Sequence, residues 1–238
     1  MSSGILVFIE NKGGTANRSS FEAIAAAQAF GSQLQQPVSA VVLGADVAAL
    51  AQEIAAYDIA RVIAVNDPKL AEYTPDAYAD ALEQVVKQTD PNLVFLTHTY
   101  QVRDFAPKLA ARFQKSLISD CIRAKADNGK IGFTRRIFLG KLDADVSSDG
   151  EAPVFATFQT GAYRPDQATK GGAAAVESMT VQIGDVRMVP EPAFQEAKQA
   201  VDLTKAEVIV AVGRGIKSKD NLVLAEKLAE VQIGRAHV

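Results

Sequence analysis

The fold class follows from one segment near the start of the chain, Ile5-Leu6-Val7-Phe8-Ile9. Gly4 bounds these five consecutive apolar residues on one side, and the polar loop Glu10-Asn11-Lys12-Gly13-Gly14 bounds them on the other. A strand with one solvated face alternates apolar and polar residues, whereas an unbroken apolar run of this length is typical of a strand buried on both faces. The segment therefore predicts a buried strand of the kind found in parallel sheets.

Strands and amphipathic helices alternate after this segment. The first helix is predicted from Ser19-Ser20-Phe21-Glu22, where a carboxylate three residues after a serine gives a capping-box signature. Thr74-Pro75 starts another helix, because proline loses no hydrogen bond at the first helical position. The other predicted elements are strands over 38–43, 61–65 and 93–96 and helices over about 47–54 and 105–113. Short connections between them imply right-handed crossovers, so we expect a Rossmann-like α/β layer with a parallel sheet.

The pattern changes after Ser116. Four further strands are predicted over 121–126, 130–138, 141–146 and 153–158, with turn signals at 127–129 and 147–150. These strands are expected to form an antiparallel extension of the sheet. Residues 174–183 alternate in a way that favours one more strand.

A domain boundary is expected at Val189-Pro190-Glu191-Pro192. The predicted organisation is an N-terminal α/β domain over 1–188, a linker over 189–205 and the first βα unit of a second domain over 206–232. That unit has a buried strand at Val208–Val212 and a helix over 221–231. One strand and one helix bury too little surface to form a domain, so we expect this second domain to be truncated and loosely packed.

The last six residues, 233–238, read Ile-Gly-Arg-Ala-His-Val. A common sequencing adapter gives the same six residues when it is translated in one frame. We therefore expect a non-native tail in which His237 has no function; a natural polar tail is the alternative.

Composition excludes several classes of protein. The 25 Lys and Arg residues nearly balance the 28 Asp and Glu residues, which argues against a dedicated nucleic-acid or anionic-membrane surface. A single cysteine, Cys121, cannot form an internal disulfide or a cysteine-based metal site. No leader is recognisable and no apolar run approaches the roughly 20 residues that span a bilayer, so we expect a cytoplasmic chain that does not cross a membrane.

The strongest candidate site is Gly213-Arg214-Gly215-Ile216-Lys217-Ser218, between a predicted strand and a predicted helix. Backbone N–H groups and the helix dipole favour anions at such a turn, and the glycines permit a close approach and positive φ angles. Arg214 adds a forked donor that can hold a phosphate at two points. Anion binding is one interpretation; a glycine-rich turn with a solvated arginine is the other.

Three other features favour structural roles. Lys12-Gly13-Gly14 follows a strand, but a flexible glycine pair is common there. His98 lies at the carboxyl end of a strand, where open α/β sheets place ligands, yet no carboxylate or thiol is near it in sequence. Cys121 is predicted to be a core residue. No Gly-x-Ser-x-Gly elbow, carboxylate pair or metal-ligand cluster occurs, so a self-contained hydrolase is not expected.

Several segments resemble the electron transfer flavoprotein alpha subunit. The similarity lies in the first strand with Ser20-Phe21-Glu22, in the segment from Phe105 to Arg112 leading to Ser119-Asp120-Cys121, in the strands over 135–146 and 153–157, and above all in Gly213–Ser218 with Asn221. The resemblance covers residues 4 to 232. It implies an electron carrier rather than a stand-alone catalyst, with FAD held mainly in the C-terminal domain and contacted by Arg214.

The resemblance also implies partners. They are a beta subunit, acyl-CoA or other flavin dehydrogenases as donors, and a quinone reductase or another acceptor. Other FAD-binding segments of the family are absent from this sequence, so the 238-residue chain alone is expected to bind FAD weakly or not at all. Two alternatives stay open: a non-redox adenine-nucleotide-binding module, since this layer is a general nucleotide-binding architecture, and a purely structural partner domain.

Overall fold

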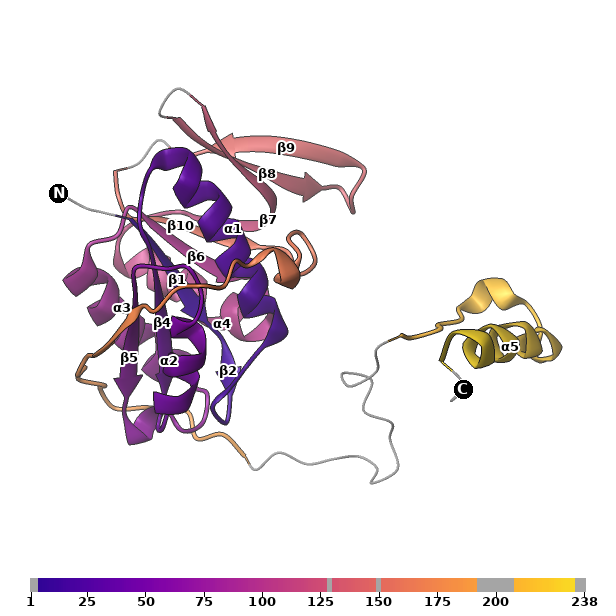
Figure 1. Ribbon diagram of the computed structural model, residues 1–238, viewed down its shortest axis with the longest axis horizontal. Coiled ribbons are helices and arrows are strands. Elements are labelled where there is room, and N and C mark those ends of the chain that lie inside the picture. The colour runs from indigo at the N-terminus through magenta and orange to yellow at the C-terminus, as the bar shows by residue number, and fades with distance from the viewer. Residues whose placement is uncertain (1–3, 128–129, 149–150, 192–207, 234–238) are drawn as a thin grey trace. The chain divides into compact units, whose positions relative to one another are not determined.

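The computed structural model, which describes residues 4–127, 130–148, 151–191 and 208–233, contains a nine-stranded sheet (Figure 1). In chain order the strands are β1 (Ile5–Ile9), β4 (Val38–Gly44), β5 (Arg61–Asn66), β6 (Leu93–Thr97), β7 (Leu117–Asp127), β8 (Lys130–Ile137), β9 (Leu142–Ser147), β10 (Val154–Phe158) and β11 (Ala175–Ser178). Their order across the sheet is β11-β5-β4-β1-β6-β10-β7-β8-β9. All five residues of β1 are buried, and β1 pairs in parallel with both β4 and β6, as the apolar run predicts.

Four helices cover the two faces of this sheet. They are α1 (Arg18–Leu34), α2 (Ala48–Ala55), α3 (Pro75–Thr89) and α4 (Tyr100–Arg112). Helices α1 and α2 pack on one face, and α3 and α4 pack on the other (Figure 1). Each face has its own apolar layer. The ring centres of Phe30 and Phe95 lie 5.8 Å apart in the first layer, and those of Phe8 and Phe105 lie 5.4 Å apart in the second. The predicted Rossmann-like α/β layer is confirmed.

The start of α1 differs from the capping box expected at Ser19. The N-cap is Asn17, whose side chain accepts a hydrogen bond from the Ser19 N–H at 3.1 Å. The Glu22 carboxylate instead accepts the N–H of Gly161 at 2.6 Å. The helix therefore begins earlier, and Glu22 fixes a loop that is distant in sequence.

The predicted antiparallel extension is correct for three strands and wrong for the fourth. Strands β7, β8 and β9 pair antiparallel, and the side chain of Phe133 in β8 is 1 % exposed in the core beside α1. Strand β10, however, inserts between β6 and β7 and pairs in parallel with both. Its five residues are all buried, so its apolar run suits an interior parallel strand. The turn signals at 127–129 and 147–150 fall partly outside the described residues.

Strand β11 is shorter than the segment predicted over 174–183. It pairs in parallel with β5 and ends at Ser178. Val181 and Ile183 are nevertheless buried, at 6 % and 8 % exposure, in the apolar layer of α3 and α4. The alternation that indicated a strand therefore reflects burial of every second side chain without a neighbouring strand.

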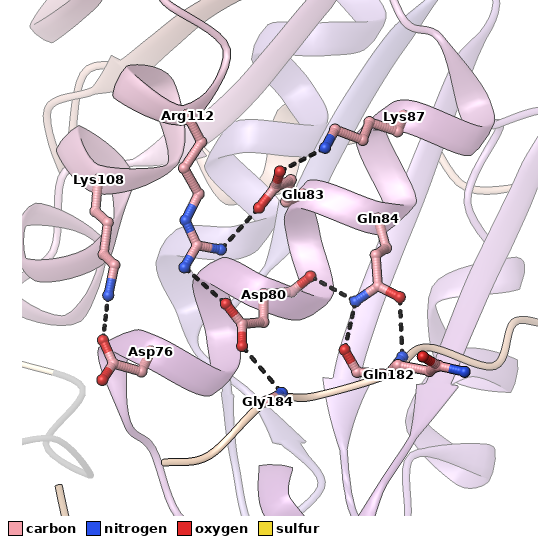
Figure 2. Close-up of polar contacts among 9 residues, drawn as sticks. All are labelled: Asp76, Asp80, Glu83, Gln84, Lys87, Lys108, Arg112, Gln182 and Gly184. Carbon is pink, nitrogen blue, oxygen red and sulfur yellow. Dashed lines mark hydrogen bonds and ion pairs between the residues drawn. The ribbon is translucent and has the colours of Figure 1, made fainter. Parts of the chain in front are cut away.

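Side chains of α3 hold the backbone of this segment (Figure 2). The Gln84 amide makes two bonds to Gln182: its Nε2 donates to the carbonyl at 2.8 Å, and its Oε1 accepts from the N–H at 2.9 Å. Asp80 accepts the N–H of Gly184 at 3.2 Å and forms an ion pair with Arg112 of α4 at 2.7 Å. Side chains thus supply the hydrogen bonds that a strand partner would otherwise make, and they fix the chain before it leaves this unit.

The chain divides into two compact units, residues 1–190 and 191–238. In the second unit the described residues include helix α5 (Leu222–Ile233), which agrees with the predicted helix. The strand predicted at Val208–Val212 is absent: residues 208–213 have no regular structure, and Ile209 is 55 % exposed. A strand needs a neighbour for its hydrogen bonds, and the described part of this unit offers none. Most of the predicted linker (192–205) and of the predicted tail (234–238) lies outside the described residues.

Candidate functional site

A polar cleft of about 610 Å³ opens at the carboxyl ends of β1 and β6 in the first unit. From β1 the chain proceeds to β4 and β5 on one side and then crosses to β6 on the other, so the direction of winding reverses between β1 and β6. Open α/β sheets bind ligands at this kind of switch point. The cleft is lined by Glu10, Asn17, Ser19, His98, Thr99, Tyr100, Gln101, Arg103 and Thr160.

The Glu10 side chain lies at the base of the cleft and is 8 % exposed. Its Oε1 accepts a hydrogen bond from Asn17 Nδ2 at 2.8 Å, and its Oε2 accepts one from the Thr99 hydroxyl. Asn17 and Thr99 are the N-cap residues of α1 and α4. One carboxylate therefore links the N-terminal caps of two helices across the switch point. No local motif indicates this role of Glu10; the only signal in the sequence is that Glu10 and Thr99 closely follow buried strands.

His98 also lines the cleft and is held by residues that are distant in sequence. Its Nδ1 is 2.9 Å from the Thr157 hydroxyl, which accepts the N–H of Asp120 at 3.0 Å and is therefore free to donate to His98. The Nε2 atom lies 4.0 Å from an Asp120 carboxylate oxygen. Burial lowers the pKa of His98, although the charge of Asp120 opposes this. These contacts support the structural interpretation of His98, with a carboxylate neighbour that the sequence did not indicate.

The rim of the cleft is formed by residues of the first turns of α4. Tyr100 is 88 % exposed, and the Arg103 guanidinium lies 5.6 Å from the centre of its ring. Gln101 Nε2 is buried and has no hydrogen-bond partner among the described residues. The rim therefore carries cationic and neutral groups, whereas the base carries a carboxylate.

Two other candidates have structural roles. Lys12 belongs to a small hairpin formed by β2 (Asn11–Lys12) and β3 (Thr15–Ala16). Gly13 and Gly14 form the turn of this hairpin. Their φ angles are 56° and 76°, in the positive region that glycine adopts readily. Cys121 is buried, and burial raises its pKa to about 12, so its thiol is unreactive at neutral pH. No group of three or more metal-ligating side chains occurs within the described ranges.

Arg214, the predicted cofactor-binding residue, lies in the second unit at the start of a short 3₁₀ turn, η4 (Arg214–Ile216). The turn is braced by its own chain: Asn221 Nδ2 donates to the carbonyl of Ile216 at 2.8 Å, and Ser218 accepts the N–H of Asp220 at 3.2 Å. The Arg214 side chain is exposed and has no ion-pair partner among the described residues. The turn thus presents, just before a helix, a guanidinium that no other described residue pairs with.

The glycines of this turn do not act as predicted. Gly213 has a φ of −116°, and the positive φ in the turn belongs to Lys217, at 67°. A Cβ added at Gly213 or Gly215 would meet no atom within 4 Å. Within the described residues these glycines therefore leave open space beside Arg214 rather than allowing a tight turn.

No helix in the described part of the chain combines the length and the hydrophobicity that crossing a bilayer requires.

Comparison with known proteins identifies the family. The family described as electron transfer flavoprotein domain matches residues 5–183. The electron transfer flavoprotein subunit alpha of Bacillus subtilis is 35% identical over 97% of this chain and 70% of its own length. The same subunit of Syntrophomonas wolfei is 34% identical over 96% of this chain and 70% of its own.

A third relative has a more specific name. The acryloyl-CoA reductase electron transfer subunit beta of Anaerotignum propionicum is 30% identical over 95% of this chain and 70% of its own length. The family match covers the whole parallel sheet and its antiparallel extension, and the relatives extend the similarity across the Arg214 turn. The chain therefore belongs to the electron transfer flavoprotein family, as an alpha-type subunit that acts in electron transfer.

Proposed function

We propose that this chain carries electrons as the alpha subunit of a heterodimer, that its flavin is FAD, and that Arg214 binds the phosphates of that FAD. The observation that carries the proposal is the Arg214 guanidinium, which is exposed, has no partner among the described residues and lies on a turn held by the Asn221 side chain. A guanidinium makes two parallel hydrogen bonds to a phosphate, and a braced turn loses little entropy when it does so. The donor set therefore fits a pyrophosphate.

The chemistry divides between the flavin and the protein. FAD, when bound, supplies the electron-accepting and electron-donating ring system. Arg214 holds and orients the phosphate end, and the open space at Gly213 and Gly215 allows the phosphates to approach the backbone. Ser218 caps the short 3₁₀ turn η5 (Lys219–Asn221), which leads into α5, and the positive dipole end of α5 adds to the attraction.

The partners that we propose are a beta subunit, an acyl-CoA or other flavin dehydrogenase as electron donor, and a quinone reductase or another acceptor. The dehydrogenase is supported by the Anaerotignum propionicum relative, whose name connects it with a reductase that acts on a CoA thioester. The beta subunit is supported by the relatives named as alpha subunits.

The test is the FAD affinity of a longer chain. This sequence would be continued with the C-terminal region of the Bacillus subtilis relative and produced together with that organism's beta subunit. We expect a yellow heterodimer in which Arg214→Ala weakens FAD binding by about 10- to 100-fold, the loss for a charge-assisted hydrogen bond pair. The FAD affinity of Arg214→Lys should lie between those of the parent and of Arg214→Ala, because lysine keeps the charge but loses the forked pair of donors.

Lys219→Ala is the matched control, since it removes a neighbouring exposed cation without a proposed role. It should change the affinity by less than about threefold. Unchanged affinity in Arg214→Ala would refute the proposed role of Arg214 but not the proposal that FAD is the cofactor. A colourless heterodimer would refute FAD as the cofactor.

A further inference from the structure

The Glu10 carboxylate has an unusual place in the first unit. It is buried between the N-terminal ends of α1 and α4, and the N-cap side chains of both helices donate to it. Helix N-termini carry partial positive charge, and two of them meet at this switch point. Both carboxylate oxygens act as acceptors, which is the pattern of an ionised side chain. The chain thus places its own negative charge where the fold concentrates positive potential.

Ligands of open α/β sheets place their anionic groups at such positions. Phosphates bind at the N-terminus of a helix that follows a strand, close to the switch point. Here the Thr99 hydroxyl and Asn17 Nδ2, which could donate to a phosphate, already donate to Glu10. A second anion in the cleft would lack these donors and would meet a buried like charge.

We propose that Glu10 is a built-in anion that closes the switch-point cleft to phosphate-bearing ligands. It stabilises two helix caps and takes up the side-chain donors that a nucleotide phosphate would need at this switch point, although the layer has a nucleotide-binding architecture. The Arg103 guanidinium on the rim makes no ion pair with Glu10, so the base of the cleft stays negative. The inference stands apart from the role of Arg214, which lies in the other unit.

The test is chemical rescue of Glu10→Ala in the 238-residue chain. Removing the side chain opens a small space between two helix N-termini and leaves the N-cap donors unpaired. The variant should melt at a lower temperature than the parent, and 50 mM acetate or phosphate should restore about half of the loss, relative to chloride at equal ionic strength. The parent should show no saturable anion effect beyond the chloride control.

Glu10→Gln is the matched control, because it removes the charge but fills the space. It should be destabilised without being rescued by either anion. If Glu10→Ala does not fold in chloride, its refolding yield in acetate and in chloride measures the same rescue. Absence of rescue in Glu10→Ala would overturn the proposal. So would saturable stabilisation of the parent by phosphate, since the cleft would then be open to anions.

Discussion

Glu10 and Arg214 are two charged residues in similar places with opposite surroundings. Each follows an apolar run and precedes a helix. The Glu10 carboxylate is buried and accepts two hydrogen bonds, whereas the Arg214 guanidinium is exposed and has no partner among the described residues. A charge that the chain has already paired stabilises the fold, and a charge left unpaired on a braced turn is available to a ligand. Glu10 therefore stabilises the first unit, and the proposed function places flavin binding in the second.

The largest expected effect compares a buried aromatic side chain of the first unit with an exposed apolar side chain of the second. Phe133 is 1 % exposed and packs against Phe30 and Phe95, so Phe133→Ala should lower the free energy of unfolding by about 3–5 kcal/mol. Leu224 of α5 is 66 % exposed, so Leu224→Ala should change it by no more than about 0.5 kcal/mol. Urea unfolding of both variants measures the difference. Equal losses would mean that α5 contributes to a core as β8 does.

A second comparison concerns the two charges directly. Glu10→Ala leaves two N-cap donors without their acceptor and should cost about 2–4 kcal/mol of unfolding free energy. Arg214→Ala removes an exposed side chain and should change stability by less than about 0.5 kcal/mol. The same urea titration measures both. A large loss in Arg214→Ala would show that its guanidinium is already engaged within the chain.

A smaller effect is expected where α3 holds the segment after β11. Gln84→Ala removes both bonds to the backbone of Gln182 and should cost about 1 kcal/mol. Hydrogen exchange at the amides of Gln182 and Gly184 should become faster. Gln28→Ala is the control, because Gln28 holds the backbone of Thr169 in the same two-way manner. If Gln28→Ala accelerated exchange at Gln182 equally, the effect would be a general loss of stability.

The sequence predicted the elements that depend on neighbouring residues. The unbroken apolar run of β1 and the proline at the start of α3 are local signals, and both elements are where they were expected. Strand β10 was assigned to the wrong kind of pairing, because its residues indicate a strand but cannot say which strands flank it. The strand predicted at Val208–Val212 failed for a related reason: an apolar run becomes a strand only beside a partner.

The candidate site was predicted only in part. The Arg214 turn is recognisable from residues adjacent in sequence, although its positive φ lies at Lys217 rather than at a glycine. The contact between Glu10 and Thr99 joins residues 89 positions apart, and that between His98 and Asp120 depends on the pairing of β10 with β7. Such contacts follow from strand order, which no local motif encodes.

The smallest effect is a pH dependence of the first unit. Burial lowers the pKa of His98 in the folded chain below its value of about 6.5 in the unfolded chain, with Asp120 opposing and Arg103 and Arg135 adding to the decrease. The unfolded state therefore binds more protons below pH 6.5, and this part of the stability is present above that pH and is lost as the pH falls.

The loss of unfolding free energy between pH 7 and pH 5 should accordingly be smaller in His98→Gln than in the parent. The raised pKa of Glu22 acts in the opposite direction, but it is common to both proteins and cancels in the difference. Identical slopes for the two proteins would show that His98 does not titrate abnormally.

The most direct measurement is the FAD affinity of the extended heterodimer with two substitutions compared side by side. Arg214→Ala should weaken binding by about 10- to 100-fold, whereas Glu10→Gln should leave it within about threefold of the parent, once both variants are shown to be folded. This result would place flavin binding at the unpaired charge and fold stabilisation at the paired one. The reverse order, with Glu10→Gln losing FAD and Arg214→Ala retaining it, would contradict the assignment of the two units.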